Sequence, residues 1–368
     1  MFETDENTNH FSLLVTGNGF DIALNLPTKY EDFLKMLKTA KNITDIGEFI
    51  DSNKGRISNE ADCLSFINVF KSIENENYFL RYFLAYKYVL EKWCDVEQEI
   101  KNIVLSFDAF LFNVSKASLT HSKAYIGSLE NVKTLNIFHP EFVRQWHGFV
   151  FRTDDDYHTG TIVDADYIGN FTAYTQKNRF EEIRKEIVDA LYKDLNDFKL
   201  LFSLYIKCFA VCSHLTLPKS LSVDCIITYN YTKSTELCVD HIDKPFYIHG
   251  QGTNIVLGIC SDSSFHDHRF NRFTKLSQRT NIPNMDINDY LGEGSFIGYI
   301  GFSFNENDKE TIAEFFKQDD IIHIIYYLNE SAKNDIVENL MSIITFEKYN
   351  RLFNSHKIRY ELSSKIFN

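Results

Sequence analysis

The chain has 368 residues, 44% hydrophobic and 15% aromatic, which suits one large α/β core that carries a second lobe. Its formal net charge of -13 argues against non-specific binding to nucleic acid or to an anionic membrane. The seven cysteines form no C-x-x-C pair, and neither a secretory signal nor a membrane-spanning apolar run is present. We therefore expect free thiols, no bound metal and a cytoplasmic protein.

The N-terminal half begins with a predicted strand and continues with predicted helices. Residues 11–16 form an apolar run typical of a buried strand, and the apolar residues of 29–40 recur with helical spacing. Residues 51–62 are polar and predict a loop. Residues 64–113 lack proline and repeat apolar residues every three or four positions, and the same helical pattern returns at 179–213.

The rest of the chain changes character. Within an ambiguous stretch, residues 132–138 fit a strand, and 150–170 resemble a loop. Short apolar runs that end in polar turns then predict buried strands. These runs lie at 225–228, 246–248, 255–259, 296–300 and 321–328. One long helix is predicted over 332–354. Strands of this kind with helices between them indicate a largely parallel sheet.

The first predicted strand lies about 200 residues before the others, which indicates an interrupted domain. We predict a Rossmann-like α/β fold, a mostly parallel sheet, interrupted by a large helical insertion. In this scheme residues 1–45 form the first βα unit, 46–220 the insertion and 221–368 the remainder of a nucleotide-binding domain.

Polar residues follow the predicted strands at the ends where parallel sheets bind ligands. They are Gly17-Asn18-Gly19, Thr228-Tyr229-Asn230, His249-Gly250, Gly301-Phe302-Ser303 and Asn329. A glycine turn that leads into a helix lets backbone amides approach a diphosphate, and we expect a branched residue at Gly19 to prevent nucleotide binding. Each segment alone also fits a simple turn or cap, so the prediction rests on their convergence at one edge.

Several charged residues leave two interpretations open. Asp21 suits a carboxylate that holds a ribose hydroxyl or steadies a developing cation, and it equally suits a helix N-cap. Trp93 and Glu97 suit packing of the insertion on the core, with a carboxylate that closes the pocket as the alternative. The basic residues within 266–279 fit a solvated face or an anion site.

These motifs resemble the AbiH family of bacterial abortive-infection proteins. The resemblance rests on Val15-Thr16-Gly17-Asn18-Gly19-Phe20-Asp21, on Leu26-Pro27-Thr28 with Tyr30 and Phe33, and on Trp93-Cys94-Asp95-Val96-Glu97. It extends to Thr228-Tyr229-Asn230-Tyr231-Thr232, Tyr247-Ile248-His249-Gly250 and Gly301-Phe302-Ser303 with Asp308. The resemblance covers residues 11 to 330 and implies an antiphage role.

The same blocks are more distantly similar to the sirtuin-like NAD fold. By position, that similarity implies that Asn230 and His249 are the catalytic pair. The implied nucleotide contacts are Gly17, Gly19, Gly301, Ser303 and Asn329, and we also expect Asn18, Asp21 and Thr228 to contact the nucleotide. Thr232 stands where sirtuins have Asp, and the zinc-binding cysteine pairs are absent, so deacylation is not implied.

The chemistry that follows is cleavage of the nicotinamide–ribose bond of NAD, whose transition state resembles an oxocarbenium ion. Asn230 would position a water molecule, and His249 would accept its proton. The leading hypothesis is an antiphage effector that consumes NAD, with a homo-oligomer as one possible state and no nucleic-acid or membrane partner. The alternative is a nucleotide-binding sensor or scaffold without turnover.

Overall fold

The computed structural model describes most of the chain. The described residues are 10–85, 94–120, 124–126, 151–152, 161–163, 173–210, 221–243, 245–252, 254–259, 265–279 and 286–367. Sequence expectations for Trp93 and for 132–138 lie outside these residues.

A seven-stranded sheet forms the centre of the α/β part, and all of its strand pairs are parallel. Its order is β10-β9-β8-β1-β5-β6, and β7 also pairs with β5. The strands are β1 (His10–Thr16), β5 (Ser222–Thr228), β6 (Asp240–His241), β7 (Phe246–Tyr247), β8 (Phe296–Ile300), β9 (Ile322–Tyr327) and β10 (Ile358–Leu362). The predicted mostly parallel α/β sheet is confirmed.

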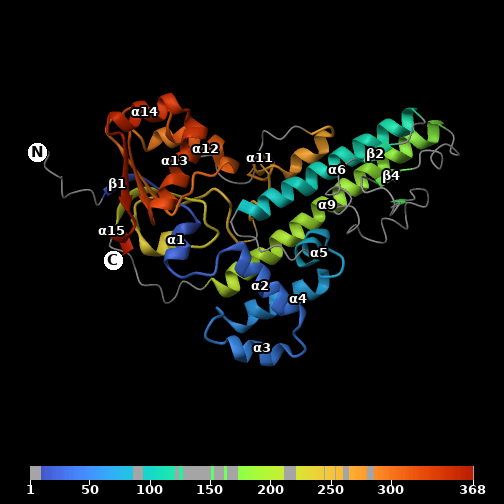
Figure 1. Ribbon diagram of the computed structural model, residues 1–368. Coiled ribbons are helices and arrows are strands. Elements are labelled where there is room, and N and C mark those ends of the chain that lie inside the picture. Colours follow the sequence, from blue (N-terminus) through green and yellow to red (C-terminus); the bar gives the residue numbers. More distant parts are fainter. Residues whose placement is uncertain are drawn as a thin grey trace, which may run out of the picture.

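Helices cover both faces of this sheet (Figure 1). Because neighbouring side chains on a strand point to opposite faces, Leu13 and Val15 join one apolar layer and Leu14 joins the other. The first layer includes side chains of α12 (Lys309–Phe315), α13 (Glu330–Ile344) and α14 (Phe346–Asn354), and the second those of α1 (Asn18–Ala23), α10 (Ser234–Cys238) and α15 (Ser364–Phe367). The result is a three-layer α/β/α arrangement.

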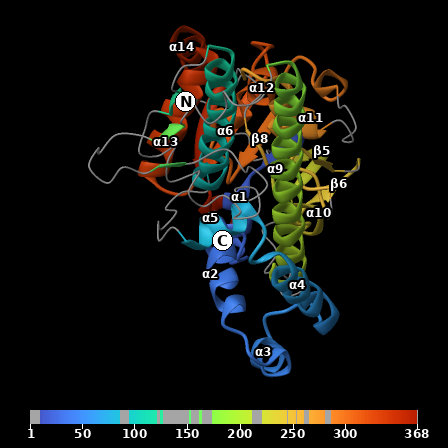
Figure 2. The same cartoon turned by 90° about the vertical axis from the view of Figure 1, so that its right-hand side faces the viewer.

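A separate group of helices extends away from the sheet (Figures 1 and 2). Its long helices are α6 (Cys94–Thr120) and α9 (Ala173–Phe209). Its shorter helices are α2 (Tyr30–Lys41), α3 (Ile46–Asn53), α4 (Glu60–Ile73) and α5 (Tyr78–Ala85). They share one aromatic-rich core, in which Phe33 contacts Phe198, Phe202 and Tyr205. A small antiparallel sheet of β2 (Ala124–Ile126), β3 (Phe151–Arg152) and β4 (Thr161–Val163) accompanies α6 and α9.

The connections between β7 and β9 contain short helical turns. These are η2 (His268–Phe273), α11 (Lys275–Gln278), η4 (Ile287–Asp289) and η5 (Glu306–Asp308). Phe270 and Phe273 of η2 belong to the core of the helical group, although they lie between strands in the sequence. Residues 265–279 therefore join the helical group to the sheet.

Several local predictions need correction. The expected loop at 51–62 contains the end of α3 and the start of α4, since Asp45 and Asn59 cap those helices. Short strands β3 and β4 occur within the expected loop at 150–170. Residues 255–259 form no ladder strand and have only one isolated bridge, from Ile259 to Thr274.

The predicted helix at 332–354 is in fact two helices. Thr345 has a φ of 70°, which breaks the helical path between α13 and α14. The chain then returns as β10, an edge strand that periodicity did not predict. Among the described residues, no helix combines the length and hydropathy that a bilayer crossing requires.

Candidate active site

Parallel register brings the predicted site residues to one edge of the sheet. Thr16 pairs with both Thr228 and Ile300, and Thr228 pairs with Tyr247. Asn230 and His249 each lie two residues beyond that last pair, just after the ends of the adjoining strands β5 and β7. The sequence prediction that these polar turns meet at the carboxyl end of the sheet is therefore correct.

His249 lies in a buried aromatic environment, with 4% of its surface exposed. The Tyr229 ring meets the imidazole edge to face at 5.3 Å, and the Tyr231 ring stacks on it at 5.7 Å. Gly250 has a φ of 72°, and its N–H donates to the carbonyl of Tyr247, so a tight turn fixes the backbone of His249. A Cβ at Gly250 would lie 1.8 Å from the carbonyl oxygen of Asn254.

A buried charge cluster surrounds the other side of the imidazole. His249 Nε2 lies 3.1 Å from Asp308 Oδ1. Lys275 Nζ lies 3.2 Å from the same oxygen, 2.9 Å from Glu97 Oε2 and 3.4 Å from His249 Nε2. Arg279 adds a second cation 3.3 Å from Asp308. The cluster thus combines two carboxylates and two cations, so the buried charges are paired.

Electrostatics within the cluster keep His249 neutral at pH 7. Burial lowers the pKa of His249, and the Lys275 ammonium lowers it further against the opposite effect of Asp308. Burial by itself would raise the pKa of Asp308, but Lys275 and the other neighbouring groups hold that pKa well below its usual range. We therefore assign the imidazole proton to Nε2, facing the Asp308 carboxylate, with the lone pair on Nδ1.

Asn230 belongs to a second polar cluster centred on Asp21 of α1. Asn230 Nδ2 donates to Asp21 Oδ1 over 3.2 Å, the Thr232 hydroxyl donates to the same carboxylate over 2.9 Å, and Ser234 also donates to it. The Asn230 N–H donates to Thr228 Oγ1 over 3.1 Å. Backbone and side chain of Asn230 are thereby fixed, and Asp21 does not cap its own helix: Gly17 occupies the N-cap.

The buried Asp21 carboxyl makes the stability of the fold depend on pH. Burial raises its pKa to about 6, in spite of the hydrogen bonds from Ser234 and Thr232. When a carboxyl group has a higher pKa in the folded protein than in the unfolded chain, it contributes stability at pH values below its unfolded pKa, which is near 4. This stability is lost as the pH rises through the pKa of the folded protein. Between pH 4 and pH 7, we expect the free energy of unfolding of the wild type to fall by about 2 kcal/mol relative to Asp21→Asn.

Denaturant unfolding of both proteins at each pH measures this difference. Asparagine keeps an acceptor oxygen for the two hydroxyl groups and does not titrate, so other titrating groups cancel in the comparison. A constant difference across the pH range would show that Asp21 titrates as an ordinary carboxyl group.

Three predicted site residues carry buried polar atoms without a hydrogen-bond partner among the described residues. They are Asn18 Nδ2, Asn230 Oδ1 and His249 Nδ1. The opposite atoms of these side chains are bound, since Asn18 Oδ1 accepts from Thr28, Asn230 Nδ2 donates to Asp21 and His249 Nε2 faces Asp308. Buried polar atoms normally have partners, so this pattern marks positions where a ligand or water would bind.

The glycine turns contact one another. A Cβ on Gly17 would lie 2.6 Å from the Gly301 carbonyl oxygen, and one on Gly19 would lie 2.7 Å from Gly301 Cα. The N–H groups of Gly17, Gly19 and Phe20 donate to the carbonyls of Ile300, Gly301 and Gly17. The close packing of the two turns therefore requires glycine at these positions, and the amide groups are already hydrogen-bonded within the protein. Gly19→Val consequently tests folding rather than diphosphate binding.

The remaining predicted nucleotide contacts are dispersed. Thr228 is buried and hydrogen-bonded to Thr16, so it supports the turn that holds Asn230. Ser303 and Asn329 are exposed near the ends of β8 and β9, and Asn329 caps α13 by accepting from the Ala332 N–H. A nucleotide-binding role of these three residues stays a prediction.

Most of the charge cluster was not predicted from the sequence. The basic segment that contains Lys275 and Arg279 fitted a solvated face or an anion site, Glu97 fitted packing or a carboxylate that closes the pocket, and Asp308 had no assigned role. Their side chains meet because the 265–279 segment brings Lys275 into contact with both Glu97 of α6 and Asp308 of η5. The one usable signal was the Trp-x-Asp-x-Glu block, which contains Glu97. Within the described residues, no group of three or more His, Cys, Asp or Glu could hold a metal ion.

Comparison with known proteins assigns the family. No curated protein and no solved structure shows a significant similarity to the chain. A family model described as Bacteriophage abortive infection AbiH matches residues 13–328, which include every residue of the two polar clusters. The chain therefore belongs to the AbiH family of bacteriophage abortive-infection proteins.

Proposed function

We propose that this AbiH protein hydrolyses the nicotinamide–ribose bond of NAD as its effector reaction in abortive infection. The observation that carries the proposal is the pair of buried atoms His249 Nδ1 and Asn230 Oδ1, which lack partners among the described residues. They extend from adjoining strands at the edge where α/β sheets bind ligands.

The environment of His249 suits a general base. Its Nε2 faces the Asp308 carboxylate, as in the orienting pairs of hydrolases, and this leaves a lone pair on Nδ1. Because burial and Lys275 lower the pKa of His249, the imidazole is neutral at pH 7 and accepts a proton. A base of this kind contributes a rate factor of about 10² to 10⁴.

Asn230 supplies a neutral acceptor just after the end of β5, the strand that adjoins β7. Its side-chain orientation is fixed by Asp21 and its backbone by Thr228, so Oδ1 is preorganised to accept from water or a ribose hydroxyl. The charge on Asp21 lies behind Asn230 and favours the positive charge that develops on the ribose in the transition state.

The proposed reaction consumes one water molecule. As the C1′–N bond of the nicotinamide riboside breaks, its electron pair passes to the pyridine ring, which leaves as neutral nicotinamide. Water forms the new C1′–O bond and gives a proton to His249 Nδ1, which later releases it to solvent. The products are nicotinamide, ADP-ribose and one proton, so atoms and charge balance.

The length of the sheet edge supports an extended ligand. Four strand spacings separate β7 from β9, and each is about 4.8 Å, so the edge spans about 19 Å. This span accommodates a dinucleotide with its nicotinamide end beside Asn230 and its adenosine end towards Ser303 and Asn329.

The direct experiment incubates the purified protein with NAD and measures free nicotinamide. A cellular experiment measures NAD after phage infection in cells that carry the wild type or an Asn230 variant. We expect NAD to fall only with the wild type. Protection of infected cells at constant NAD would exclude NAD hydrolysis as the effector reaction.

Asn230→Ala separates an NAD hydrolase from a nucleotide-binding sensor. We expect the variant to bind NAD within a few-fold of the wild type and to release no nicotinamide, because Asn230 acts mainly in the transition state. Calorimetry measures NAD binding, and an assay of free nicotinamide measures turnover. Asn102→Ala, at an exposed position of α6, is the control and should match the wild type in both. Unchanged turnover in a folded Asn230→Ala protein contradicts the proposed role.

A further inference from the structure

Lys275 is the most deeply buried lysine in the described site, with 3% of its surface exposed. Its ammonium lies within 3.2 Å of two carboxylates from different parts of the chain, Glu97 of α6 and Asp308 of η5. Lysine is almost never buried unless it is paired, so the position of this ammonium is specified by the two carboxylates.

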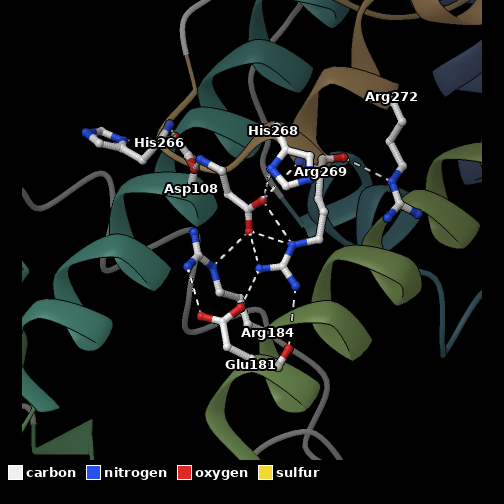
Figure 3. Close-up of polar contacts among 8 residues, drawn as sticks. Asp108, Glu181, Arg184, His266, His268, Arg269 and Arg272 are labelled. Carbon is white, nitrogen blue, oxygen red and sulfur yellow. Dashed lines mark hydrogen bonds and ion pairs between the residues drawn. The ribbon is translucent and has the colours of Figure 1, made fainter. Parts of the chain in front are cut away.

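The segment that carries Lys275 is anchored to the helical group by a second network (Figure 3). Asp108 of α6 accepts from the N–H groups of His266 and Asp267 over 2.7 and 3.0 Å. Arg184 of α9 and the neighbouring Arg269 both pair with the buried Asp267 carboxylate at 2.8 Å. The start of η2 is thereby tied to both long helices.

Helix α6 therefore contacts this segment at two points. Glu97 and Asp108 are 11 residues apart, which corresponds to about 16 Å along a helix. Asp108 holds the start of the 265–279 segment, and Glu97 holds Lys275 inside the site. The helical group thus contributes directly to the surroundings of His249.

We propose that Lys275 is a positioning residue, which Glu97 of the helical group holds against Asp308 so that Asp308 stays on His249 Nε2 and leaves Nδ1 free to accept a proton. The proposal rests on the function proposed above for its catalytic consequence. Its structural part, control of the His249 protonation state by Lys275, applies to any substrate of this site.

The groups that face His249 determine how removal of Lys275 changes the pKa of the imidazole. They are Asp308 from η5, Lys275 from α11, Glu97 from α6, Arg279 beyond α11, and the rings of Tyr229 and Tyr231 beyond β5. Without the ammonium, the two carboxylates outweigh Arg279 and raise the pKa of His249, against the opposing effect of burial. A larger fraction of the imidazole is then protonated at a given pH, and protonation removes the lone pair of Nδ1.

The test compares the titration of His249 by NMR in the wild type, Lys275→Met and Lys275→Arg. His249→Gln identifies the resonance. We expect Lys275→Met to move the titration upward by at least about one pH unit and Lys275→Arg to restore much of the wild-type value. The double variant Lys275→Met with Glu97→Gln removes both members of one ion pair, which keeps the proposal testable where the single variant does not fold.

Activity gives the second readout. On NAD, Lys275→Met should lower kcat at pH 7 with little change in KM, and its activity should recover at higher pH as the imidazole deprotonates. An unchanged His249 titration in folded Lys275→Met and in the folded double variant would overturn the positioning role. If the His249 titration shifts in Lys275→Met but neither the wild type nor the variant releases nicotinamide, Lys275 keeps its positioning role and NAD hydrolysis is excluded.

Discussion

Replacing His249 with glutamine should lower the rate of nicotinamide release by at least about a hundred-fold, because the variant keeps a polar side chain but loses the general base. The loss should appear in kcat, since the proton is transferred in the transition state. Measurement of kcat and KM with saturating and limiting NAD separates this effect from weaker binding.

His323→Gln is the control for this experiment. His323 is also buried, stacks on Phe316 at 4.0 Å and bonds to the Tyr299 hydroxyl over 3.0 Å, but it belongs to β9 in the sheet core. Its replacement should reduce stability and leave kcat of the folded protein unchanged. Equal activity of the wild type and a folded His249→Gln protein would exclude His249 as the base.

Gly301→Ala should destabilise the fold by more than about 4 kcal/mol, a large part of the stability of a typical domain. Gly301 has a φ of 61°, and a Cβ there would lie 2.0 Å from the Phe20 nitrogen and 2.3 Å from the carbonyl carbon of Gly19. These are backbone atoms of the first turn of α1, so neither side can yield without disturbing the contact between β1 and β8. Urea unfolding followed by circular dichroism measures the loss.

Gly252→Ala provides a matched control. Gly252 has the same φ of 61°, but a Cβ there would have nothing within 4 Å. Its substitution should cost about 1–2 kcal/mol for the left-handed backbone alone. The difference between the two variants measures the close approach of the two glycine turns. A similar cost at both positions would mean that backbone conformation, and not this contact, makes glycine necessary at 301.

Both glycine turns also bear on how the nucleotide would bind. Because the Gly17 and Gly19 amides bond to the turn after β8, a diphosphate finds fewer donors there than a glycine-rich turn suggests. Among the predicted site residues, Asn18, Asn230 and His249 have buried side-chain atoms without a partner in the described part of the chain. In the proposed reaction these side chains, more than the backbone cradle expected from the sequence, would recognise the nucleotide.

The sequence by itself determined the central strands of the sheet and the polar residues that follow them. Apolar runs such as 11–16 and 296–300 form strands wherever they are buried on both faces, and the polar residues after them must emerge at the carboxyl ends of parallel strands. For that reason Asn230 and His249 could be placed together before any contact was known. The same reasoning could not separate glycines needed for chain packing from glycines needed for a ligand.

Only the tertiary structure decided which charges complete the site. Glu97, Lys275 and Asp308 lie far apart in the sequence, and no local pattern distinguishes them from solvated charges. They become a buried cluster because the 265–279 segment packs against α6 and against the connection after β8, and burial makes pairing of each charge obligatory. Local sequence sets strands and turns through short-range sterics and hydrophobicity, whereas the protonation state of His249 depends on groups that long-range packing alone brings within 4 Å of one another.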